Sequence, residues 1–233
     1  MCGRFTTLSD PTELAKRFAA RLPEGVRQRY NVAPAQSVLT LREVETERVA
    51  DLMRWGLVPH WAKDASVSYK MINARAETVS EKPAYKKLLA SKRCLIPADG
   101  FYEWTTAPDG KKVPIRFTLT TGDLFAFAGL WTSWVDKESG ELLDSFTIIT
   151  TTPNELVART HNRMPVILLV DQETRWLDPA LAVDDARALF APFPAEQMVA
   201  NVASRRVNRA GPDDVELLTP DEGDEDLLTL LVA

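Results

Sequence analysis

The fold class can be argued from one stretch, residues 93–151, which reads RCLIPADGFYEWTTAPDGKKVPIRFTLTTGDLFAFAGLWTSWVDKESGELLDSFTIITT. Short apolar runs alternate in it with turn sequences that contain Asp-Gly, Gly-Asp or Ser-Gly pairs, a pattern typical of strands joined by tight turns. The expected strands are Arg93–Pro97, Phe101–Thr105, Val113–Thr120, Leu124–Trp131 and Ser145–Thr151. Consecutive strands joined in this way pair antiparallel, so the stretch predicts an antiparallel sheet curled into a barrel-like shape.

Helices are expected on both sides of this sheet. Asp10 is a typical N-cap and Pro11 a typical first helical residue. Leu14, Phe18 and Leu22 then recur at helical spacing. Further elements are expected as a helix from Pro83, a helix opened by the capping box 152–155 and ending near His161, a buried strand over 163–169, and helices over Gln172–Leu177 and Asp184–Ala191. Because no linker or repeat divides the chain, we predict one α+β domain over residues 1–233, with a mainly antiparallel, barrel-like curled sheet flanked by short helices.

Charge is distributed unevenly along the chain, whose formal net charge is −5. Residues 1–95 carry 17 Lys and Arg against 10 Asp and Glu, whereas residues 96–233 carry 11 against 23. Eight of the acids lie in an acidic C-terminal tail from about residue 213, and tails of this kind are commonly solvated. We therefore expect a local positive groove on an acidic protein, with the tail away from it.

Several function classes are excluded by what the sequence lacks. Two cysteines, Cys2 and Cys94, cannot build a disulfide framework and indicate a reducing compartment. No charge-free run approaches the roughly 18 residues that span a membrane, and the N-terminus has no apolar secretion segment. The expected location is therefore the cytoplasm, at the nucleoid if the source is bacterial, with no membrane contact. Phosphate-binding glycine motifs and metal-ligand spacings are missing, so neither a cofactor nor a metal is expected.

Cys2 is a candidate reactive residue because of where it lies in the chain. Removal of Met1 would leave a 1,2-aminothiol whose α-amine has an ordinary pKa of about 7.7–8.0. A primary amine attacks an aldehyde to give a Schiff base, and the adjacent thiol can then close onto the imine carbon as a thiazolidine. Alternatively, Cys2 is only a small residue buried in a first strand.

Polar residues also lie within segments that otherwise read as buried. Asn73, Arg75 and Glu77 alternate, and on an extended strand they would share one face. Glu103 stands among aromatic residues, where desolvation raises a carboxyl pKa toward the range of a general acid or base. Alternatively, Glu103 faces solvent or pairs with an arginine.

The histidines and tryptophans give weaker signals. His161 follows the capped helix and is a candidate acid or base, although a lone histidine is more often structural. Trp104 is the candidate for stacking on a base of single-stranded nucleic acid. His60 and Cys94 read as loop packing and an inert core thiol.

Ordered motifs through nearly the whole chain resemble those of one family. They are Met1-Cys2-Gly3-Arg4, Arg29-Tyr30-Asn31-Val32-Ala33-Pro34, Trp55-Gly56-Leu57-Val58-Pro59, Asn73-Ala74-Arg75-Ala76-Glu77-Thr78, the segment from Arg93 to Trp104, Gly129-Leu130-Trp131, and the segment from His161 to Leu168. Together they resemble the SOS-response-associated peptidase (SRAP) family, whose members crosslink to abasic sites in single-stranded DNA. Asn162 departs from the aspartate that this family commonly has after the histidine.

The resemblance implies a protein of the DNA damage and SOS response that forms a covalent link to DNA, with lyase and autopeptidase (hydrolase, protease) activity. Cys2 would attack the ring-opened sugar aldehyde, Asn73 would orient the Cys2 terminus, Glu103 would act as acid and base, and His161 would steady the sugar or the Schiff base. The DNA contacts that the resemblance implies are Arg4, Arg75, Trp104, Thr150 and Arg163. The implied partner is single-stranded DNA with abasic sites, bound by a monomer without cofactor or metal.

Two other classes of function stay open. One is a cysteine peptidase with Cys2 as nucleophile, His161 as base and Glu103 or Asn73 as orienting group. The other is a non-catalytic binder of single-stranded DNA, whose salt-sensitive affinity would not depend on an abasic site.

Overall fold

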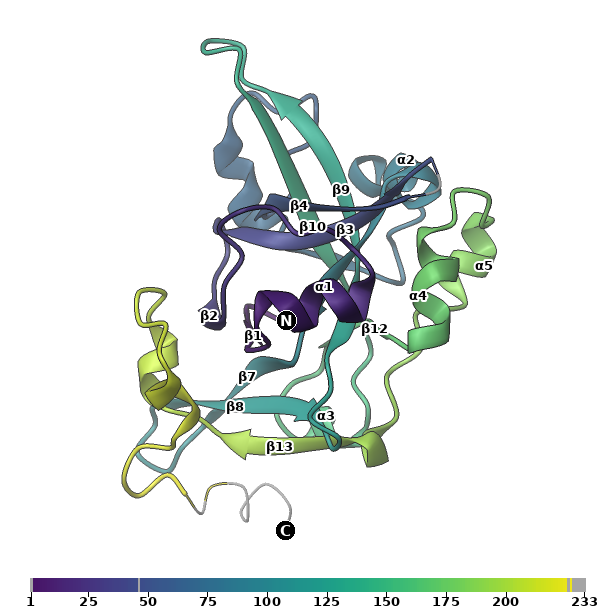
Figure 1. Ribbon diagram of the computed structural model, residues 1–233. Helices are drawn as coiled ribbons and strands as arrows, with labels where there is room; N and C mark the ends of the chain where they lie inside the picture. The colour runs from purple at the N-terminus through teal and green to yellow at the C-terminus, as the bar shows by residue number, and fades with distance from the viewer. Residues whose placement is uncertain (1, 46, 226, 228–233) are drawn as a thin grey trace.

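Thirteen strands form two sheets in the part of the chain described by the computed structural model, residues 2–45, 47–225 and 227 (Figure 1). The first sheet has the order β13-β8-β7-β1-β2, and every neighbouring pair in it is antiparallel. Its strands are β1 (Arg4–Thr7), β2 (Arg29–Val32), β7 (Gly100–Thr106), β8 (Lys112–Leu119) and β13 (Met198–Val202). Strand β1, the first of the chain, therefore lies inside this sheet, between β2 and β7.

The second sheet closes on itself. Its order is β11-β10-β4-β3-β6-β9-β12, and β10 also pairs with β9, so the path through β4, β3, β6 and β9 returns to β10. Its strands are β3 (Ser37–Val44), β4 (Glu47–Trp55), β5 (Asn73–Arg75), β6 (Arg93–Ala98), β9 (Phe125–Val135), β10 (Leu142–Thr151), β11 (Met164–Pro165) and β12 (Ile167–Leu168). The predicted barrel-like, mainly antiparallel architecture is confirmed. Two pairings are parallel, those of β10 with β4 and with β5.

Gly129 is where three strands of the closed sheet come closest. It faces Cys94 on β6 and Ile148 on β10 in register. A Cβ atom at this position would lie 2.3 Å from Ile96 Cδ1 and 3.0 Å from the Thr147 carbonyl oxygen. A side chain there would displace the end of Ile96 and press on the Thr147 carbonyl oxygen, which accounts for the glycine in an otherwise bulky run.

The helices cover the outside of the sheets, with α4 and α5 at the right of Figure 1. They are α1 (Pro11–Phe18), α2 (Pro83–Ser91), α3 (Glu155–Ala158), α4 (Val170–Leu177) and α5 (Val183–Arg187), with 3-10 turns η1 (Ala65–Lys70), η2 (Ala195–Gln197), η3 (Arg205–Asn208) and η4 (Val215–Leu218). The predicted cap of α1 is confirmed, since the Asp10 carboxylate accepts from the Thr12 and Glu13 amides. Among the described residues, no helix is long and apolar enough to cross a membrane.

Several predicted boundaries are wrong. Helix α1 ends at Phe18 because Ala19 adopts a left-handed backbone with φ 49°, so Leu22 lies outside it. The capping box at 152–155 is also wrong: the N-cap is Asn154, whose Oδ1 accepts from the Val157 amide at 2.9 Å. Helix α3 consequently ends before His161. The strand expected over 163–169 is divided into β11 and β12, and α5 ends earlier than predicted.

The acidic segment from residue 213 is packed against the first sheet, at the lower left of Figure 1. Asp213 accepts hydrogen bonds from the Tyr30 and Asn31 amides of β2, at 2.6 and 3.0 Å. Asp224 is buried and forms a two-pronged ion pair with Arg205. The expectation of a solvated tail is therefore wrong for these acids, because their carboxylates bind backbone amides and arginines.

Candidate functional site

Cys2 is fully buried directly before β1, and Asn73 holds its backbone. Asn73 Nδ2 donates to the Cys2 carbonyl oxygen at 2.8 Å. Asn73 opens β5, which runs parallel to β10 with Asn73 beside Ile148. The Oδ1 atom of Asn73 is buried without a hydrogen-bond partner in the described part of the chain, so it can accept one more donor near Cys2.

Glu103 and His161 face one another at the same site. Glu103 lies on β7, neighbour of β1, and is 2% exposed, so it does not face solvent. Burial raises the pKa of its carboxyl to about 7. His161 Nε2 lies 4.0 Å from Glu103 Oε2, and burial lowers the pKa of the imidazole. The Glu103 carboxyl can therefore exchange protons near neutral pH.

The ring of His161 is oriented by Arg163. Its Nδ1 atom accepts from the Arg163 amide at 3.0 Å, the shorter of its two contacts with the Arg163 backbone, the other being the carbonyl oxygen at 3.3 Å. A ring nitrogen that accepts an N–H carries no proton itself, so the shorter contact favours the neutral tautomer with its proton on Nε2. That proton is on the nitrogen that faces Glu103.

The thiol of Cys2 is held in its neutral form. Burial, and then the charge of Glu103, raise the pKa of this thiol, and Sγ donates weakly to the Arg4 carbonyl oxygen at 3.7 Å. Hydrolytic cysteines have a lowered thiol pKa instead, set by an adjacent cation or helix N-terminus. Cys2 thus lies beside a carboxyl group in a setting that suppresses the thiolate.

A buried ion pair fixes the position of β1, and sequence reasoning missed it. Arg116 on β8 donates to Asp99 Oδ1 at 2.8 Å. Thr6 on β1 donates to the same oxygen at 2.5 Å, and the Leu8 amide donates to Oδ2. The partners of Asp99 lie 17 and more than 90 residues away in the chain. No local pattern reports such a contact.

Three of the expected DNA contacts meet around Thr150. Arg75 pairs with Thr150 across β5 and β10, and Arg163 Nη2 donates to the Thr150 carbonyl oxygen at 2.5 Å. Arg75 is exposed, whereas Thr150 is buried. Arg163 donates from Nη1 and Nη2 to the two carboxylate oxygens of Glu77, at 2.5 and 3.0 Å. The expected face shared by Asn73, Arg75 and Glu77 is wrong at its end, since β5 stops at Arg75 and Glu77 lies in the following turn.

Arg4 and Trp104 are placed differently with respect to Cys2. Arg4 is two residues from Cys2, and burial lowers the pKa of its guanidinium. Trp104 is adjacent to Glu103 on β7, so its side chain points to the opposite face of the sheet. There it packs with Tyr102 and donates from Nε1 to Asn208 Oδ1 at 2.6 Å. The strand therefore separates the Trp104 side chain from the Glu103 carboxyl group.

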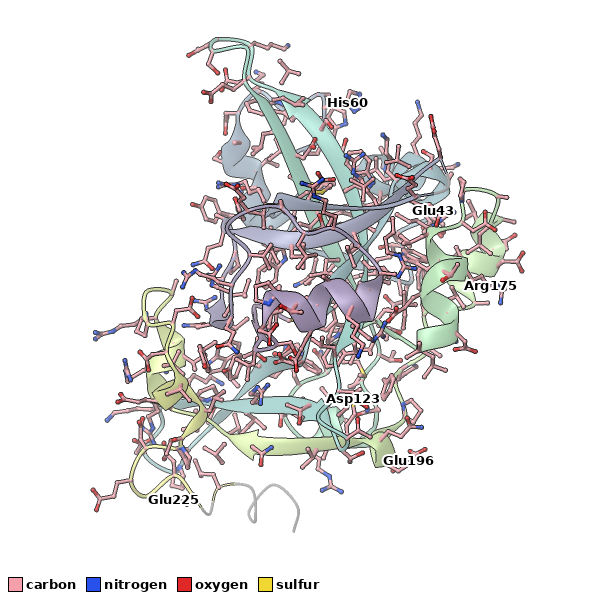
Figure 2. All side chains as sticks on the ribbon, viewed as in Figure 1. Glu43, His60, Asp123, Arg175, Glu196 and Glu225 are labelled. Atoms are coloured by element: carbon pink, nitrogen blue, oxygen red, sulfur yellow. The ribbon has the colours of Figure 1, made fainter. Side chains whose placement is uncertain are left out.

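The remaining candidates lie outside the site. His60 is exposed and lies in the upper part of the molecule in the view of Figure 2. Cys94 is buried in β6, and burial raises the pKa of its thiol, as suits a core residue. Within residues 2–45, 47–225 and 227, no group of three or more His, Cys, Asp and Glu side chains could hold a metal ion.

The arrangement brings a nucleophile and two proton-transfer groups together. Cys2, Asn73, Glu103 and His161 come from the N-terminus, β5, β7 and the turn after α3, and the first two are in direct contact. A carboxyl group with a pKa of about 7 can both take and return a proton at neutral pH. Such a site suits addition to a carbonyl carbon followed by loss of water.

Comparison with known proteins places the chain among related sequences. The family model described as SOS response associated peptidase (SRAP) matches residues 1–210. The chain is 46% identical over 222 residues to "Abasic site processing protein YoqW" of Bacillus subtilis, with 94% of the chain and 99% of that protein covered. It is 33% identical over 264 residues to "Abasic site processing protein HMCES" of Gallus gallus, with 95% of the chain and 78% of that protein covered.

Solved structures give the same grouping. A crystal structure of a protein from Bacteroides thetaiotaomicron superposes with a TM-score of 0.86 at 26% identity, covering 94% of the chain and 100% of that protein. A protein from Bordetella bronchiseptica superposes with a TM-score of 0.77 at 31% identity, covering 87% of the chain and 100% of that protein. These two proteins therefore share the fold of this chain over most of its length.

Proposed function

The chain belongs to the SOS response-associated peptidase family, and from this we propose that it processes abasic sites in single-stranded DNA by covalent capture through Cys2. The relatives named as abasic site processing proteins support the substrate class. One observation carries the proposal: Cys2 is held by Asn73 beside Glu103, whose charge acts on the Cys2 thiol, while His161 faces Glu103. An abasic deoxyribose offers the ring-opened aldehyde on which an aminothiol reacts.

The first step is formation of a Schiff base. Removal of Met1 gives the free α-amine of Cys2, whose nitrogen attacks the C1′ aldehyde carbon and forms a C–N bond. Glu103 as carboxylate takes a proton from the attacking amine. As carboxylic acid it gives that proton to the former aldehyde oxygen, which becomes the carbinolamine hydroxyl. It then transfers the second amine proton to this hydroxyl in the same way, and the hydroxyl leaves as water. The buried Oδ1 of Asn73 accepts from the amine and fixes its direction of attack.

The second step closes the thiazolidine. The neutral thiol of Cys2 adds to the imine carbon, forming the C–S bond, and its proton passes to the nitrogen. The sulfur and nitrogen of one residue then both bond to C1′, with no change in oxidation state. His161 donates a hydrogen bond from Nε2 to the sugar oxygen as the ring opens, and Arg4, Arg75 and Arg163 supply positive charge for the flanking phosphates.

The cysteine peptidase alternative is less well supported. It requires a thiolate activated by a histidine, whereas burial and Glu103 raise the pKa of the Cys2 thiol. Self-removal of Met1 is a narrower form of this activity. Mass spectrometry of C2A and E103Q chains, produced without other methionine aminopeptidase, tests it: normal loss of Met1 in both variants removes its support.

The proposal is tested by incubating the purified protein with a single-stranded oligonucleotide that holds one abasic site. We expect a heat-stable adduct with the wild type and none with C2A or with a chain that retains Met1. E103Q should slow adduct formation by roughly 10²–10⁴-fold, the usual contribution of general acid–base catalysis.

The matched control is C94A, which removes the other cysteine, a core residue away from the site. It should form the adduct at the wild-type rate. Adduct formation by C2A equal to that of the wild type contradicts the mechanism. Binding of abasic and intact strands with equal affinity and no adduct would instead identify a non-catalytic single-strand binder.

A further inference from the structure

Both terminal nitrogens of the Arg163 guanidinium are engaged by protein acceptors, whereas Nε is buried without a hydrogen-bond partner in the described part of the chain. Its side chain is 11% exposed. Nη1 and Nη2 fork onto the two carboxylate oxygens of Glu77, and Nη2 also donates to the Thr150 carbonyl oxygen. A two-pronged guanidinium–carboxylate pair is among the stronger polar contacts in proteins. A phosphate can therefore reach these two nitrogens only where Glu77 gives way.

Glu77 is able to give way. It lies in the turn after β5, with its side chain 48% exposed, and has no strand to hold it. Arg163 lowers the pKa of the Glu77 carboxyl, with a smaller contribution from Arg75, so the group is charged throughout the physiological range. The Thr150 carbonyl oxygen, by contrast, is fixed, since it also accepts from the Ala76 amide at 2.9 Å. The Thr150 carbonyl oxygen is thus a fixed acceptor for Arg163, whereas the Glu77 carboxylate can be replaced by another anion.

We propose that Glu77 competes with the DNA backbone phosphate for Arg163 and thereby sets the reversible affinity for DNA. This inference rests on the proposed function. The carboxylate presents two oxygens to the guanidinium, as a phosphate does, so binding of a strand replaces one two-pronged pair by another. The exchange lowers reversible affinity for every strand alike. Only a strand with an aldehyde is then retained covalently, so the competition favours release of intact DNA.

The experiment measures binding of E77Q and wild type to an undamaged single-stranded oligonucleotide by fluorescence anisotropy over a range of salt concentrations. We expect E77Q to bind about two- to tenfold more tightly at low salt, as suits a partly exposed ion pair. The slope of log K against log salt should become steeper by up to about 0.7, the value for one additional phosphate contact on a single strand. E81Q removes the same charge from an exposed position four residues away and should bind within twofold of wild type.

A double-mutant cycle separates competition from simple charge repulsion. Competition predicts that the gain from E77Q disappears when Arg163 is replaced by Gln. An equal gain in the R163Q background, or an E77Q affinity and slope equal to wild type, overturns the proposal. Should R163Q fail to fold, the slope of E77Q decides alone. Failure of the proposed function is seen separately, as absence of a wild-type adduct with abasic DNA.

Discussion

Glu103 and Glu173 are both 2% exposed, yet their surroundings differ in charge. Glu173 accepts two hydrogen bonds from Arg17, at 2.6 and 3.0 Å, so its negative charge is balanced. Glu103 lies 4.0 Å from an imidazole whose pKa is lowered by burial, and burial raises the pKa of the Glu103 carboxyl to about 7. Burial therefore shifts the Glu103 carboxyl toward its protonated form.

Replacement of Glu103 by Gln should stabilise the protein in a pH-dependent way. The Glu103 pKa of about 7 in the folded protein exceeds the ordinary value of 4.5. Below pH 4.5 the carboxyl is protonated in both the folded and the unfolded protein, so its charge does not lower stability there. Ionisation of the buried Glu103 lowers the free energy of unfolding increasingly between pH 4.5 and pH 7, and the loss reaches the order of 3 kcal/mol above pH 7. We expect E103Q to raise the melting temperature at pH 8.5 and to leave it unchanged at pH 4.5.

The matched variant for this prediction is E173Q, which changes an equally buried carboxylate. It leaves Arg17 without its charged partner and should lower the melting temperature at pH 8.5, where E103Q raises it. If E103Q changed the melting temperature equally at pH 4.5 and pH 8.5, burial would not be the cause of the raised Glu103 pKa.

At the level of the strands, the closed sheet depends on how closely β6, β9 and β10 approach. Gly129 on β9 is in register with Cys94 and Ile148, and Ile96 and the Thr147 carbonyl oxygen fill the space where its side chain would be. Strand β10 carries Thr150 and aligns β5, and thereby Asn73, along its length. The packing at Gly129 therefore helps to set the position of one wall of the site.

The substitution G129A should destabilise the protein by about 1–3 kcal/mol, the usual result of overpacking a core. Its Cβ would overlap Ile96 Cδ1 at 2.3 Å and press on a backbone carbonyl oxygen, which cannot rotate away. Urea denaturation measures the loss. G211A is the control, because a Cβ there meets no atom within 4 Å. Equal stability of the two variants would show that β6 and β10 separate without strain.

At the scale of the whole molecule, the acidic segment after residue 212 packs against the first sheet. Asp213 binds two amides of β2 and the Arg29 side chain. Arg205 lies between Asp109, in the turn after β7, and Asp224. The acidic side chains of this segment are therefore largely paired with protein donors, on the side of the molecule that carries β2. The net charge of the whole chain does not describe the charge around Cys2.

Replacement of Asp213 by Ala should lower the free energy of unfolding by about 2–4 kcal/mol, because two β2 amides and Arg29 lose their acceptor. D214A removes the neighbouring carboxylate, a half-exposed partner of Arg206, and should cost less than about 1 kcal/mol. Urea denaturation of both variants compares them. Equal losses would mean that the segment is held by its apolar contacts and not by Asp213.

The sequence alone was sufficient for the fold class and for the elements of residues 93–151. Alternating apolar runs and turn pairs are local signals, and all five predicted strands are present as β6 to β10. The parallel pairings of β10 and the closure of the second sheet were not predictable in this way. They join residues far apart in the chain, and the energy of such pairings leaves no local pattern.

Residue type and position indicate Cys2, Glu103 and His161 as candidate residues, and the resemblance of the motifs to the family supports the same three. Only the tertiary structure decided their surroundings: the contact of Asn73 with Cys2, the fork of Glu77 on Arg163, the opposite face of Trp104, and the ion pair of Asp99 with Arg116. The physical reason is the same throughout. Residue chemistry is local and can be read along the chain, whereas burial, pKa and charge pairing depend on which distant segments pack together.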